Sequence, residues 1–415
     1  MSEPVLKLGE HYVSDFLNAD ESSADRKKYS LDLYMDEAIG AVRLRSEDLP
    51  PADAMWGRYW YRSGTNVTMT AELGKIVQEV TERVHYKTGD VWLDIACNDG
   101  TLLRQVPLEF KKVGIDPCDD SFYELSSKHA TVVQDYFSAD AYKRAFASAD
   151  EVKKAKVITC IAMFYDLDNP HTFIQDLYDV LDDNGIIVLQ MSYTPLMLQQ
   201  MAFDNICHEH VYYHSLTSIQ NLFKQHGMMI VDANVNDTNG GSIRIYLAKE
   251  NCSPETFGTQ QLRQVCAYRA DSILNFERIA DISDPVVWQT FGTKINALKI
   301  SLLDFIKTAR SEGKTIYGYG ASTKGNTLLQ LFGLTANDIT AIAERSPYKF
   351  GKKTVGTEIP IVSEEEMRAA KPDYLLVLPW HFIDEFVKRE RDYLEAGGAL
   401  VVPCPEFKVI TKADL

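Results

Sequence analysis

Residues 205–216 read N-I-C-H-E-H-V-Y-Y-H-S-L and hold three of the nine histidines in the chain, next to a carboxylate and two tyrosines. Imidazole titrates near neutral pH, and a neighbouring carboxylate can hold it in one tautomer. This stretch, centred on His208, Glu209 and His210, therefore predicts proton-transfer chemistry. Two alternatives stay open. His208 and His210 would share one face of a strand and could ligate a metal, or the stretch could be a polar loop at the mouth of a cleft.

Such chemistry needs a scaffold, and four strand-like segments precede the stretch, at residues 91–96, 113–117, 130–137 and 156–166. Each ends in small, polar or aromatic residues, which predicts a parallel sheet with a ligand across its carboxyl edge. The candidate cofactor-binding residues on these strand ends are Asp94, Ala96, Asn98, Asp99, Gly100, Asp116, Pro117, Gln134, Asp135, Tyr136, Phe137, Ala162 and Met163.

The first of these strands runs into a turn that reads A-C-N-D-G, in a strand–turn–helix pattern. A nicotinamide-binding domain would carry G-x-G-x-x-G there, so this turn provides poorly for a pyrophosphate. An adenosyl cofactor without phosphates needs only a close turn and an acid for the ribose hydroxyls, and Asp116 ends the second strand. We therefore expect S-adenosylmethionine as the cofactor.

The last hundred residues predict a second α/β unit. Its expected strands lie at 315–320, 339–343, 374–378 and 399–402, and its helices at 324–332, 364–370 and 381–394. Residues 320–326 read G-A-S-T-K-G-N, where small hydroxyl residues, a lysine and a helix N-terminus make an anion site. A tight structural turn is the alternative, and the Walker order is missing. A sugar diphosphate would suit this site, with Lys324 supplying the charge. Trp380 and His381 end a later strand and could close over the nucleotide or sugar.

Composition excludes several classes of protein. The length of 415 residues predicts two or three domains, and a net charge of −16 gives no basis for general nucleic-acid binding. The seven cysteines form no C-x-x-C pair, which argues against a disulfide framework or a structural zinc site and suits a reducing cytosol. No apolar run reaches the length of a membrane span and no signal peptide is present, so we expect a cytoplasmic protein.

Weaker patterns fill in the rest of the chain. Further expected elements are a strand-like start at 5–9, a strand pair within 31–44, helices at 71–84 and 218–227, and strands at 228–235 and 243–247. The glycines at 240 and 241 serve a hairpin or let a ligand approach the backbone. The expected division is a small N-terminal cap at 1–70, a cofactor-binding domain at 71–254, a helical bridge at 255–311 and a second α/β domain at 312–415.

Several of these motifs together resemble the sugar-nucleotide C-methyltransferases of deoxysugar biosynthesis, from about residue 5 to residue 410. The matching segments are 93–103, 163–167, 204–210, 239–242 and 318–326, and the H-E-H and G-Y-G-A-S-T-K-G-N segments are specific to that family. The resemblance implies a class I methyltransferase Rossmann-like domain and a C-terminal Rossmann-like domain. It also implies methyl transfer from S-adenosylmethionine to a ring carbon, typically carbon 3, of a nucleotide-linked 4-keto-6-deoxysugar.

The resemblance further implies that His210 is the base, that Glu209 supports it and that Tyr61 lines the sugar site. Two departures stand out. Relatives carry a cysteine-rich N-terminal zinc module, whereas residues 35–38 read M-D-E-A here, so we expect no metal. Cys207 stands where some relatives have a tyrosine, and residues 165 and 166 stand where they have a histidine.

Carbon methylation also accounts for the histidine stretch on chemical grounds. A sugar carbon becomes nucleophilic when a proton is removed beside a ketone, which needs a base near neutral pKa and donors for the oxyanion. His210 fits the base, oriented by Glu209 or by a backbone group. The candidate donors to the ketone oxygen are Tyr61, His208, Tyr212 and Tyr213. An O-methyltransferase would also use a histidine base, and an inactive two-Rossmann binding protein is a third hypothesis.

The expected partner is a nucleotide-diphosphate sugar, bound by a monomer or homodimer. The candidate substrate-binding residues are Tyr59, Ser63, Tyr165, Tyr213, Asn239, Gly241, Ser242, Arg244, Ser322, Thr323, Lys324, Asn326, Trp380 and His381.

Overall fold

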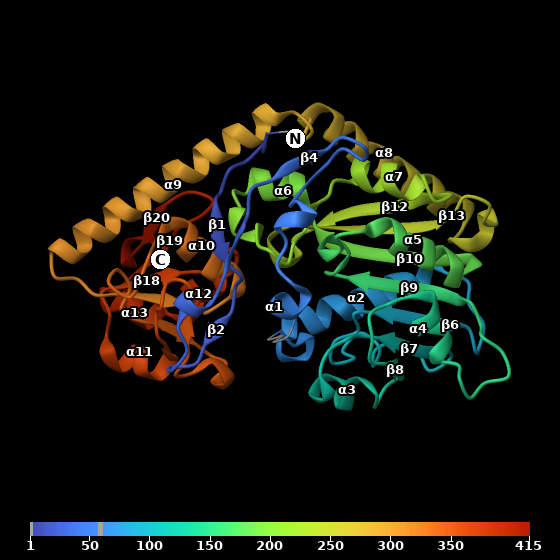
Figure 1. Ribbon diagram of the computed structural model, residues 1–415, viewed down its shortest axis with the longest axis horizontal. Coiled ribbons are helices and arrows are strands. Elements are labelled where there is room, and N and C mark those ends of the chain that lie inside the picture. Colours follow the sequence, from blue (N-terminus) through green and yellow to red (C-terminus); the bar gives the residue numbers. More distant parts are fainter. Residues whose placement is uncertain (1–2, 57–60) are drawn as a thin grey trace.

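Two α/β units, two long helices and an N-terminal segment make up the chain (Figure 1). The computed structural model describes residues 3–56 and 61–415, so Tyr59 lies outside the described residues. The first unit holds a seven-stranded sheet and the second a six-stranded sheet. The predicted α/β class, with two Rossmann-like units, is confirmed.

The first sheet has the strand order β12-β13-β10-β9-β6-β7-β8. Strands β10 to β8 in that order run parallel, and β13 is antiparallel to both of its neighbours. Because the chain order reverses beside β6, the carboxyl ends of β6, β7 and β9 form the place where such sheets bind ligands. The bounds are β6 (Val91–Ile95), β7 (Lys111–Ile115), β8 (Thr131–Val133), β9 (Ala155–Ile161), β10 (Leu181–Ser192), β12 (Met228–Asn236) and β13 (Ser242–Lys249).

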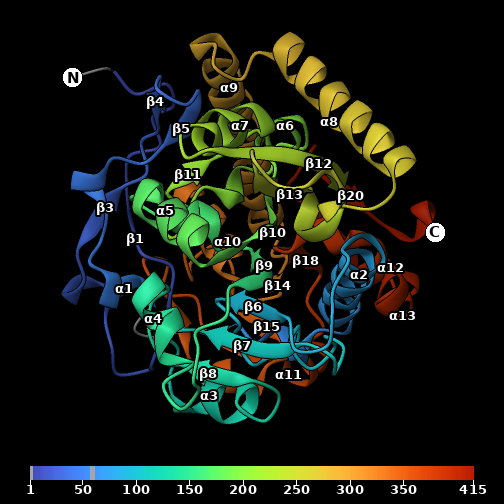
Figure 2. The same ribbon diagram turned by 90° about the vertical axis from the view of Figure 1, so that its right-hand side faces the viewer.

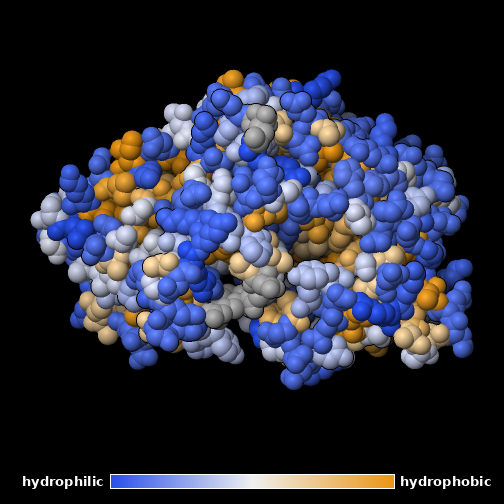
Figure 3. All heavy atoms as spheres, in the orientation of Figure 1, coloured by the Kyte–Doolittle hydropathy of each residue, from blue (hydrophilic) through white to orange (hydrophobic). Residues whose placement is uncertain are grey.

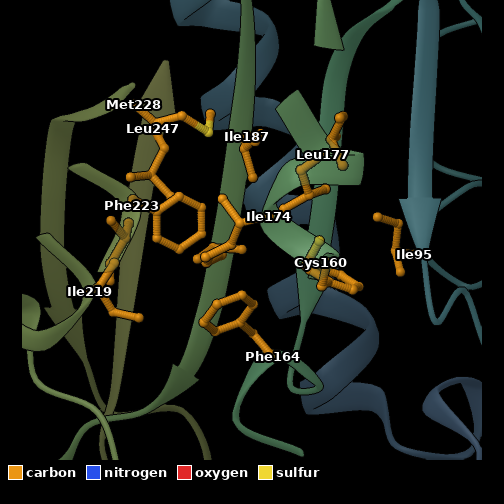
Figure 4. Packing of buried hydrophobic residues seen from close by; sticks show 14 of the residues in the cluster. Ile95, Cys160, Phe164, Ile174, Leu177, Ile187, Ile219, Phe223, Met228 and Leu247 are labelled. Atoms are coloured by element: carbon orange, nitrogen blue, oxygen red, sulfur yellow. The ribbon is translucent and has the colours of Figure 1, made fainter. Parts of the chain in front are cut away.

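Helices cover both faces of this sheet because its central strands are apolar on both sides. Figure 4 shows Phe164, Ile174 and Leu177 packed with Cys160 of β9 and Ile187 of β10. Strand β10 was not among the predicted strands, although it lies at the middle of this core. The helices are α1 (Ala52–Trp56), α2 (Val67–Arg83), α3 (Asp120–Ser126), α4 (Ala139–Arg144), α5 (Pro170–Val180), α6 (Thr194–Gln199) and α7 (Leu216–Lys224).

The helix expected directly after the A-C-N-D-G turn is wrong. Residues 101–106 form successive turns instead. The Asp99 carboxylate accepts from the Thr101 hydroxyl (2.6 Å), and the Gln105 side chain donates to the Thr101 carbonyl (3.0 Å). These side chains compete with the main chain for the groups that a helix would use.

The second sheet has the order β17-β15-β14-β18-β19-β20, with only β20 antiparallel. The single helix expected at 381–394 is divided at Glu390, a buried residue whose carboxylate accepts from Tyr319 (2.5 Å) and Arg368 (2.6 Å). The bounds are β14 (Ile316–Tyr319), β15 (Ile342–Glu344), β16 (Lys353–Thr354), β17 (Ile361–Ser363), β18 (Tyr374–Val377), β19 (Ala399–Val402), β20 (Lys408–Ile410), α10 (Thr323–Phe332), α11 (Glu364–Ala370), α12 (Ile383–Arg389) and α13 (Arg391–Glu395).

The N-terminal segment touches both units. Strand β2 pairs with β16 of the second unit, while β5 pairs with β4 and with β11 of the first, which confirms the strand pair expected within 31–44. The strand-like start at 5–9 is wrong, since only Leu6 bridges to Leu33 there. The bounds are β1 (Glu10–Tyr12), β2 (Phe16–Leu17), β3 (Lys28–Ser30), β4 (Tyr34–Asp36), β5 (Ala41–Arg43) and β11 (Tyr212–Tyr213).

Two helices, α8 (Gln260–Ala280) and α9 (Pro285–Ser311), form the expected helical stretch and lead from the first unit to the second (Figure 1). On the face shown in Figure 3, hydrophilic residues cover most of the surface. Among the described residues, no helix has the length and apolar character of a membrane span, and no group of three or more His, Cys, Asp or Glu side chains is arranged to hold a metal ion.

Candidate active site

The turn after β6 has an unusual backbone that brings three candidate residues together. Ala96 (φ 56°), Asn98 (φ 50°) and Gly100 (φ 74°) all adopt left-handed conformations. A Cβ on Gly100 would lie 2.8 Å from the Cα of Ser126, so only glycine fits this approach. The turn is therefore tightly folded at the carboxyl end of the strand, in the position that an adenosyl group needs.

Asp116, at the end of β7, closes the same turn. Its carboxylate accepts from the Asn98 N–H (2.7 Å) and from the Cys118 N–H (2.8 Å). The Cys118 thiol is a third partner, and a carboxylate has about four acceptor positions, so about one remains for a further donor. Asp99 and Asp116 make the turn acidic, whereas burial raises the pKa of Asp94 inside β6 to about 7. Such a turn suits a positively charged sulfonium better than a pyrophosphate.

A short segment after the undescribed residues lies across this turn. The Ser63 N–H donates to Asn98 Oδ1 (3.1 Å), the Gly64 N–H donates to Asp99 Oδ2 (2.9 Å), and Asn98 Nδ2 donates to the Tyr61 carbonyl (3.1 Å). Tyr61 and Ser63 therefore lie beside the turn after β6. Tyr61 is 44% exposed; partial burial and the nearby charge of Asp99 raise the pKa of its phenol, which keeps its proton at neutral pH.

The remaining strand ends contribute less uniformly. Ala162 adopts a left-handed backbone (φ 56°) after β9 and is exposed beside Met163, whereas Phe137 packs against Phe173 with a 5.0 Å ring separation and belongs to the core. Asp135 forms an ion pair with Arg144. The other strand-end residues lie at the surface of the carboxyl edge. Pro117 and Tyr136 are exposed, and the Gln134 amide donates to the Cys118 carbonyl.

His210 is held in one tautomer by the backbone. Its Nδ1 lies 2.7 Å from the Asn205 carbonyl, which can only accept, so Nδ1 carries the hydrogen and Nε2 carries the lone pair. The Tyr165 ring stands edge-on to the imidazole, 4.3 Å away. Burial, together with the charge of Lys324, lowers the pKa of His210 to about 3. The ring is therefore neutral at physiological pH, and its pKa lies well below the near-neutral value expected of the base from the sequence.

Glu209 faces other acids and does not hold His210. Burial raises the pKa of Glu209 to about 7, with a hydrogen bond to Cys207 opposing the shift and the charge of Asp15 adding to it. Burial and the Glu209 charge raise the pKa of Asp166 well above its usual range. Glu209 and a backbone group were the two candidates for orienting His210, and the Asn205 carbonyl is the one that contacts its ring.

A small cavity lies beside the imidazole. It has room for about one water molecule, and its lining residues are Tyr165, Ser192, Thr194, Met197, Asn205, His210, Tyr212 and Tyr213. The Tyr213 hydroxyl and Asn205 Oδ1 are buried and have no hydrogen-bond partner among the described residues. A pyranose ring is too large for this cavity.

His208 is not brought to this cavity. Its Nε2 contacts the Tyr29 carbonyl of β3 (3.0 Å), and burial lowers its pKa to about 4. The ring thus ties the histidine stretch to the N-terminal segment. His214, in the same stretch, contacts the Ser218 hydroxyl. Its ring stacks on that of Tyr212, in the hydrophobic core of the first unit, with the ring centres 5.2 Å apart.

Charged and polar groups of both units meet near His210. Lys324 Nζ reaches the Asn239 carbonyl (3.5 Å), and a Cβ on Gly240 would lie 3.6 Å from the His381 Cβ. Burial lowers the pKa of Lys324, with the acid Asp204 opposing that shift. The hairpin before β13 and the predicted anion turn before α10 therefore face each other, with the lysine between them.

A short 3-10 turn (Phe203–Asn205) contacts both the second unit and the imidazole of His210. The Trp380 indole donates to the buried Asp204 carboxylate (3.0 Å), and Phe203 stacks on Phe332 of α10 (5.2 Å). The next residue is Asn205, whose carbonyl holds His210 Nδ1. The second unit thus fixes the turn that orients the histidine of the first.

Several predicted substrate residues have structural partners. Arg244 is buried in ion pairs with Glu72 (2.5 Å) and Glu79 (2.8 Å) of α2. Ser322 caps α10, accepting from the Gly325 N–H (2.9 Å). Gly241 packs on Leu196, and Ser242 donates to the Thr238 carbonyl. The Thr323 carbonyl accepts from the Ser14 hydroxyl, and the Asn326 amide donates to the Asp15 carbonyl.

Two residues of this site, Asp204 and Asn205, were not among the candidates. Both stand in the same D-N-I-C-H-E-H segment. Asp204 was detectable, because an acid beside a catalytic histidine stretch is a candidate in its own right. Asn205 acts through its carbonyl, which every residue possesses, so its side-chain type gave no signal.

Comparison with known proteins decides the class of reaction. A methyltransferase domain model matches residues 68–233, and a C-methyltransferase C-terminal domain model matches residues 237–405. The chain is 27% identical to C-methyltransferase NovU of Streptomyces niveus over 411 residues, covering 98% of this chain and 94% of that protein. The protein is an S-adenosylmethionine-dependent C-methyltransferase.

Solved methyltransferases share less with this C-methyltransferase. The plantazolicin methyltransferase BpumL in complex with SAH has a TM-score of 0.33 and 13% identity, covering 44% of this chain and 83% of that chain. Magnesium protoporphyrin IX methyltransferase (ChlM) from Synechocystis PCC 6803 with bound SAM has a TM-score of 0.32 and 13% identity, covering 44% and 80%.

Proposed function

We propose that this C-methyltransferase methylates a ring carbon, carbon 3, of a nucleotide-linked 4-keto-6-deoxysugar, with His210 as the base. The observation that carries the proposal is the fixed tautomer of His210, which presents an unprotonated Nε2 close to the lysine of the second unit. A neutral imidazole whose other nitrogen is held by a carbonyl is the form that accepts a proton from carbon.

Residues of the β6 and β7 turns are proposed to hold the cofactor. Asn98, Asp99 and Gly100 shape a close backbone turn, and Asp116 has about one acceptor position left for a ribose hydroxyl. Bound there, S-adenosylmethionine supplies an electrophilic methyl group on a sulfonium. The acids around the turn favour that positive charge, and Tyr61 and Ser63 cover the site from the N-terminal side.

His210 Nε2 is proposed to take the proton from the carbon next to the ketone. The C–H electron pair becomes the double bond between that carbon and the carbonyl carbon, and the C=O π pair moves to the ketone oxygen, which gives an enolate. Attack of the enolate carbon on the methyl group would leave the electron pair of the sulfur–methyl bond on sulfur. The proton stays on the imidazole. Tyr61 is the candidate donor to the oxyanion, because the buried Tyr213 hydroxyl faces the small cavity, which the sugar does not enter.

The sugar diphosphate is proposed to lie on the side of His210 that faces the second unit. Lys324 lies close enough to lower the pKa of His210, and it supplies positive charge where the chain as a whole is acidic. Asn239 and His381 flank the lysine from opposite units. This arrangement gives the diphosphate a cation and gives the sugar a route to the base that avoids the small cavity.

The direct test is to incubate the enzyme with S-adenosylmethionine and 4-keto-6-deoxysugar nucleotides, then locate the new methyl group by mass spectrometry and NMR. The proposal expects a new carbon–carbon bond next to the ketone. A methyl group on oxygen, or turnover only with substrates that lack a ketone, would contradict it.

Lys324→Ala should raise the KM for the nucleotide sugar by about tenfold or more, because a charge-assisted contact to phosphate contributes roughly 1.5–3 kcal/mol. The affinity for S-adenosylmethionine should not change, since that site lies on the first unit. Lys314→Ala is the matched control, because this lysine is paired with Asp373 at the surface of the same unit. Equal effects of both variants would show that Lys324 does not bind the diphosphate.

Trp380→Phe removes the indole donor from the buried Asp204 carboxylate and should loosen the turn that orients His210. We expect kcat to fall by about tenfold, since displacing a catalytic group by a fraction of an ångström has effects of this order. Tyr393→Phe is the control, because it removes one hydroxyl donor to the Asp373 carbonyl elsewhere in the same unit. Calorimetry should report unchanged S-adenosylmethionine binding in both variants.

A further inference from the structure

Two buried polar atoms close to His210 have no hydrogen-bond partner within residues 3–56 and 61–415. They are the Tyr213 hydroxyl and Asn205 Oδ1, and both residues are only 4% exposed. A buried hydroxyl or amide that has no partner loses the hydrogen bonds that solvent would give it, and nearly all such groups in folded proteins are paired. These two atoms therefore need a partner that the described side chains and backbone do not supply.

Both residues line the same small cavity beside the imidazole of His210. Apart from Met197, every residue in its lining carries a hydroxyl, an amide or an imidazole. Apolar cavities stay dry, whereas a polar cavity of about this size, with two to four hydrogen-bonding partners, binds one water molecule. The cavity therefore has both the size and the partners that a single water molecule requires.

Tyr213 is held in place by its backbone and by its ring. It lies on β11, where it pairs with Val42 of β5 (Figure 2), and its ring stands edge-on to Trp288 of α9, with the ring centres 6.4 Å apart. Burial raises the pKa of its phenol well above the usual range, so the phenol keeps its hydrogen at neutral pH. The backbone N–H of Cys207 opposes this shift, but an N–H cannot accept the phenol hydrogen. Tyr213 is therefore a fixed donor that faces the cavity.

We propose that one water molecule binds in this cavity between Tyr213 and Asn205, and that Tyr213 positions His210 through it. The water accepts from the Tyr213 hydroxyl and donates to Asn205 Oδ1, which satisfies both buried atoms at once. Its second hydrogen and second lone pair serve the hydroxyls of Ser192 and Thr194 in the same lining. The effect on His210 as a base rests on the proposed function, whereas the water site does not.

Asn205 connects the water to the base because it acts through two groups. Its main-chain carbonyl binds Nδ1 of His210 (2.7 Å), while its side-chain oxygen is buried at the cavity. The second unit already holds the residue before it, since the Trp380 indole donates to Asp204. The water adds a second support from the first unit, because Tyr213 lies three residues after His210 in the same stretch. A shift of the imidazole would then have to break hydrogen bonds on both sides of Asn205.

A crystal structure of the full chain, at a resolution that shows ordered water, tests the site directly. We expect one peak of electron density in the cavity, about 2.7–3.0 Å from the Tyr213 hydroxyl oxygen and from Asn205 Oδ1. The peak should be lost in Tyr213→Phe, which removes the donor and keeps the ring. A wild-type cavity without such a peak overturns the water site, and a peak that is unchanged in Tyr213→Phe overturns the part assigned to Tyr213.

Steady-state kinetics with a 4-keto sugar nucleotide test the positioning of the base. Tyr213→Phe should lower kcat by about three- to tenfold, since a small displacement of a catalytic group has effects of this order. The KM for the nucleotide sugar should not change, because this hydroxyl does not face the sugar. Asn205→Ala keeps the main-chain carbonyl and should have an effect of similar size. Because both variants act through one water molecule, the double variant should be no slower than the slower single variant.

Single-variant effects that multiply in the double variant overturn the shared water, and a raised KM with unchanged kcat in Tyr213→Phe overturns the positioning role. Tyr142→Phe is the matched control, because it removes a buried hydroxyl that donates to the Lys153 carbonyl (2.7 Å) away from the cavity, and its kcat should equal that of the wild type. Far-ultraviolet circular dichroism confirms that each variant is folded. If no 4-keto sugar is methylated, the proposed function fails, while the crystal structures still decide the water site.

Discussion

Replacing His210 with asparagine should abolish exchange of the substrate's ring hydrogen with solvent deuterium and should lower kcat by about 10²- to 10⁴-fold, the usual contribution of a general base. Asparagine keeps a hydrogen-bonding side chain near the Asn205 carbonyl but cannot take up a proton. The exchange is measured by NMR on a 4-keto sugar nucleotide with a non-methylating analogue of the cofactor, which isolates proton removal from methyl transfer.

His171→Asn is the control, since that histidine is exposed and pairs with His226 at the surface. In the same assay we expect a defined pH dependence of the exchange rate. Because the pKa of His210 is lowered to about 3, the ring is already neutral across the range from about pH 5 to 7, and proton uptake by the ring cannot slow exchange there. Exchange that persists in His210→Asn would falsify the assignment of the base.

Asp232→Ala should reduce the free energy of unfolding by about 3 kcal/mol, the lower end of the range for removing one partner of a buried ion pair. Asp232 lies on β12 with no exposed side-chain surface, and its carboxylate binds Arg83 of α2 (2.9 Å) and Arg269 of α8 (2.9 Å). Its removal leaves two guanidinium groups without their shared acid. Urea unfolding followed by circular dichroism measures the loss.

The comparison variant is Asp183→Ala, whose carboxylate is exposed and paired with Lys249. Exposed ion pairs contribute little, so this variant should unfold at the wild-type urea concentration. If both variants unfold together, Asp232 does not hold α2 and α8 against the sheet.

Most of the architecture was predictable because its signals are local. The buried strands at 91–95 and 155–161 are continuous apolar runs, and the polar residues that end them identify the carboxyl edge. β10 escaped prediction because its first residues, L-D-D-N-G, read as a turn, although the rest of it is buried. The N-terminal strands were only partly predictable, since short edge strands depend on partners that are far away in sequence, as β2 does on β16.

The types of residue in the site were predictable from the sequence, but the groups that each of them contacts were not. The histidine stretch indicated a base, yet which histidine faces a cavity and which anchors a strand depends on distant carbonyls, those of Asn205 and Tyr29. Arg244 was predicted as a substrate ligand but is paired with acids of the protein itself. Its acids lie on α2, more than 160 residues earlier, where no local pattern could connect them.

The contact of Trp380 and Phe332 with residues 203–205 limits how this enzyme can be recombined. A chimera that takes its nucleotide-sugar specificity from a relative's C-terminal half would inherit new surroundings for the loop that aims the imidazole. Such a chimera should retain activity only if its C-terminal half still has a tryptophan at 380 and a phenylalanine at 332, which contact residues 203–205. If the proposed function holds, specificity and reactivity are not separable in this chain, because the half proposed to bind the sugar nucleotide also fixes residues 203–205, whose last carbonyl orients His210.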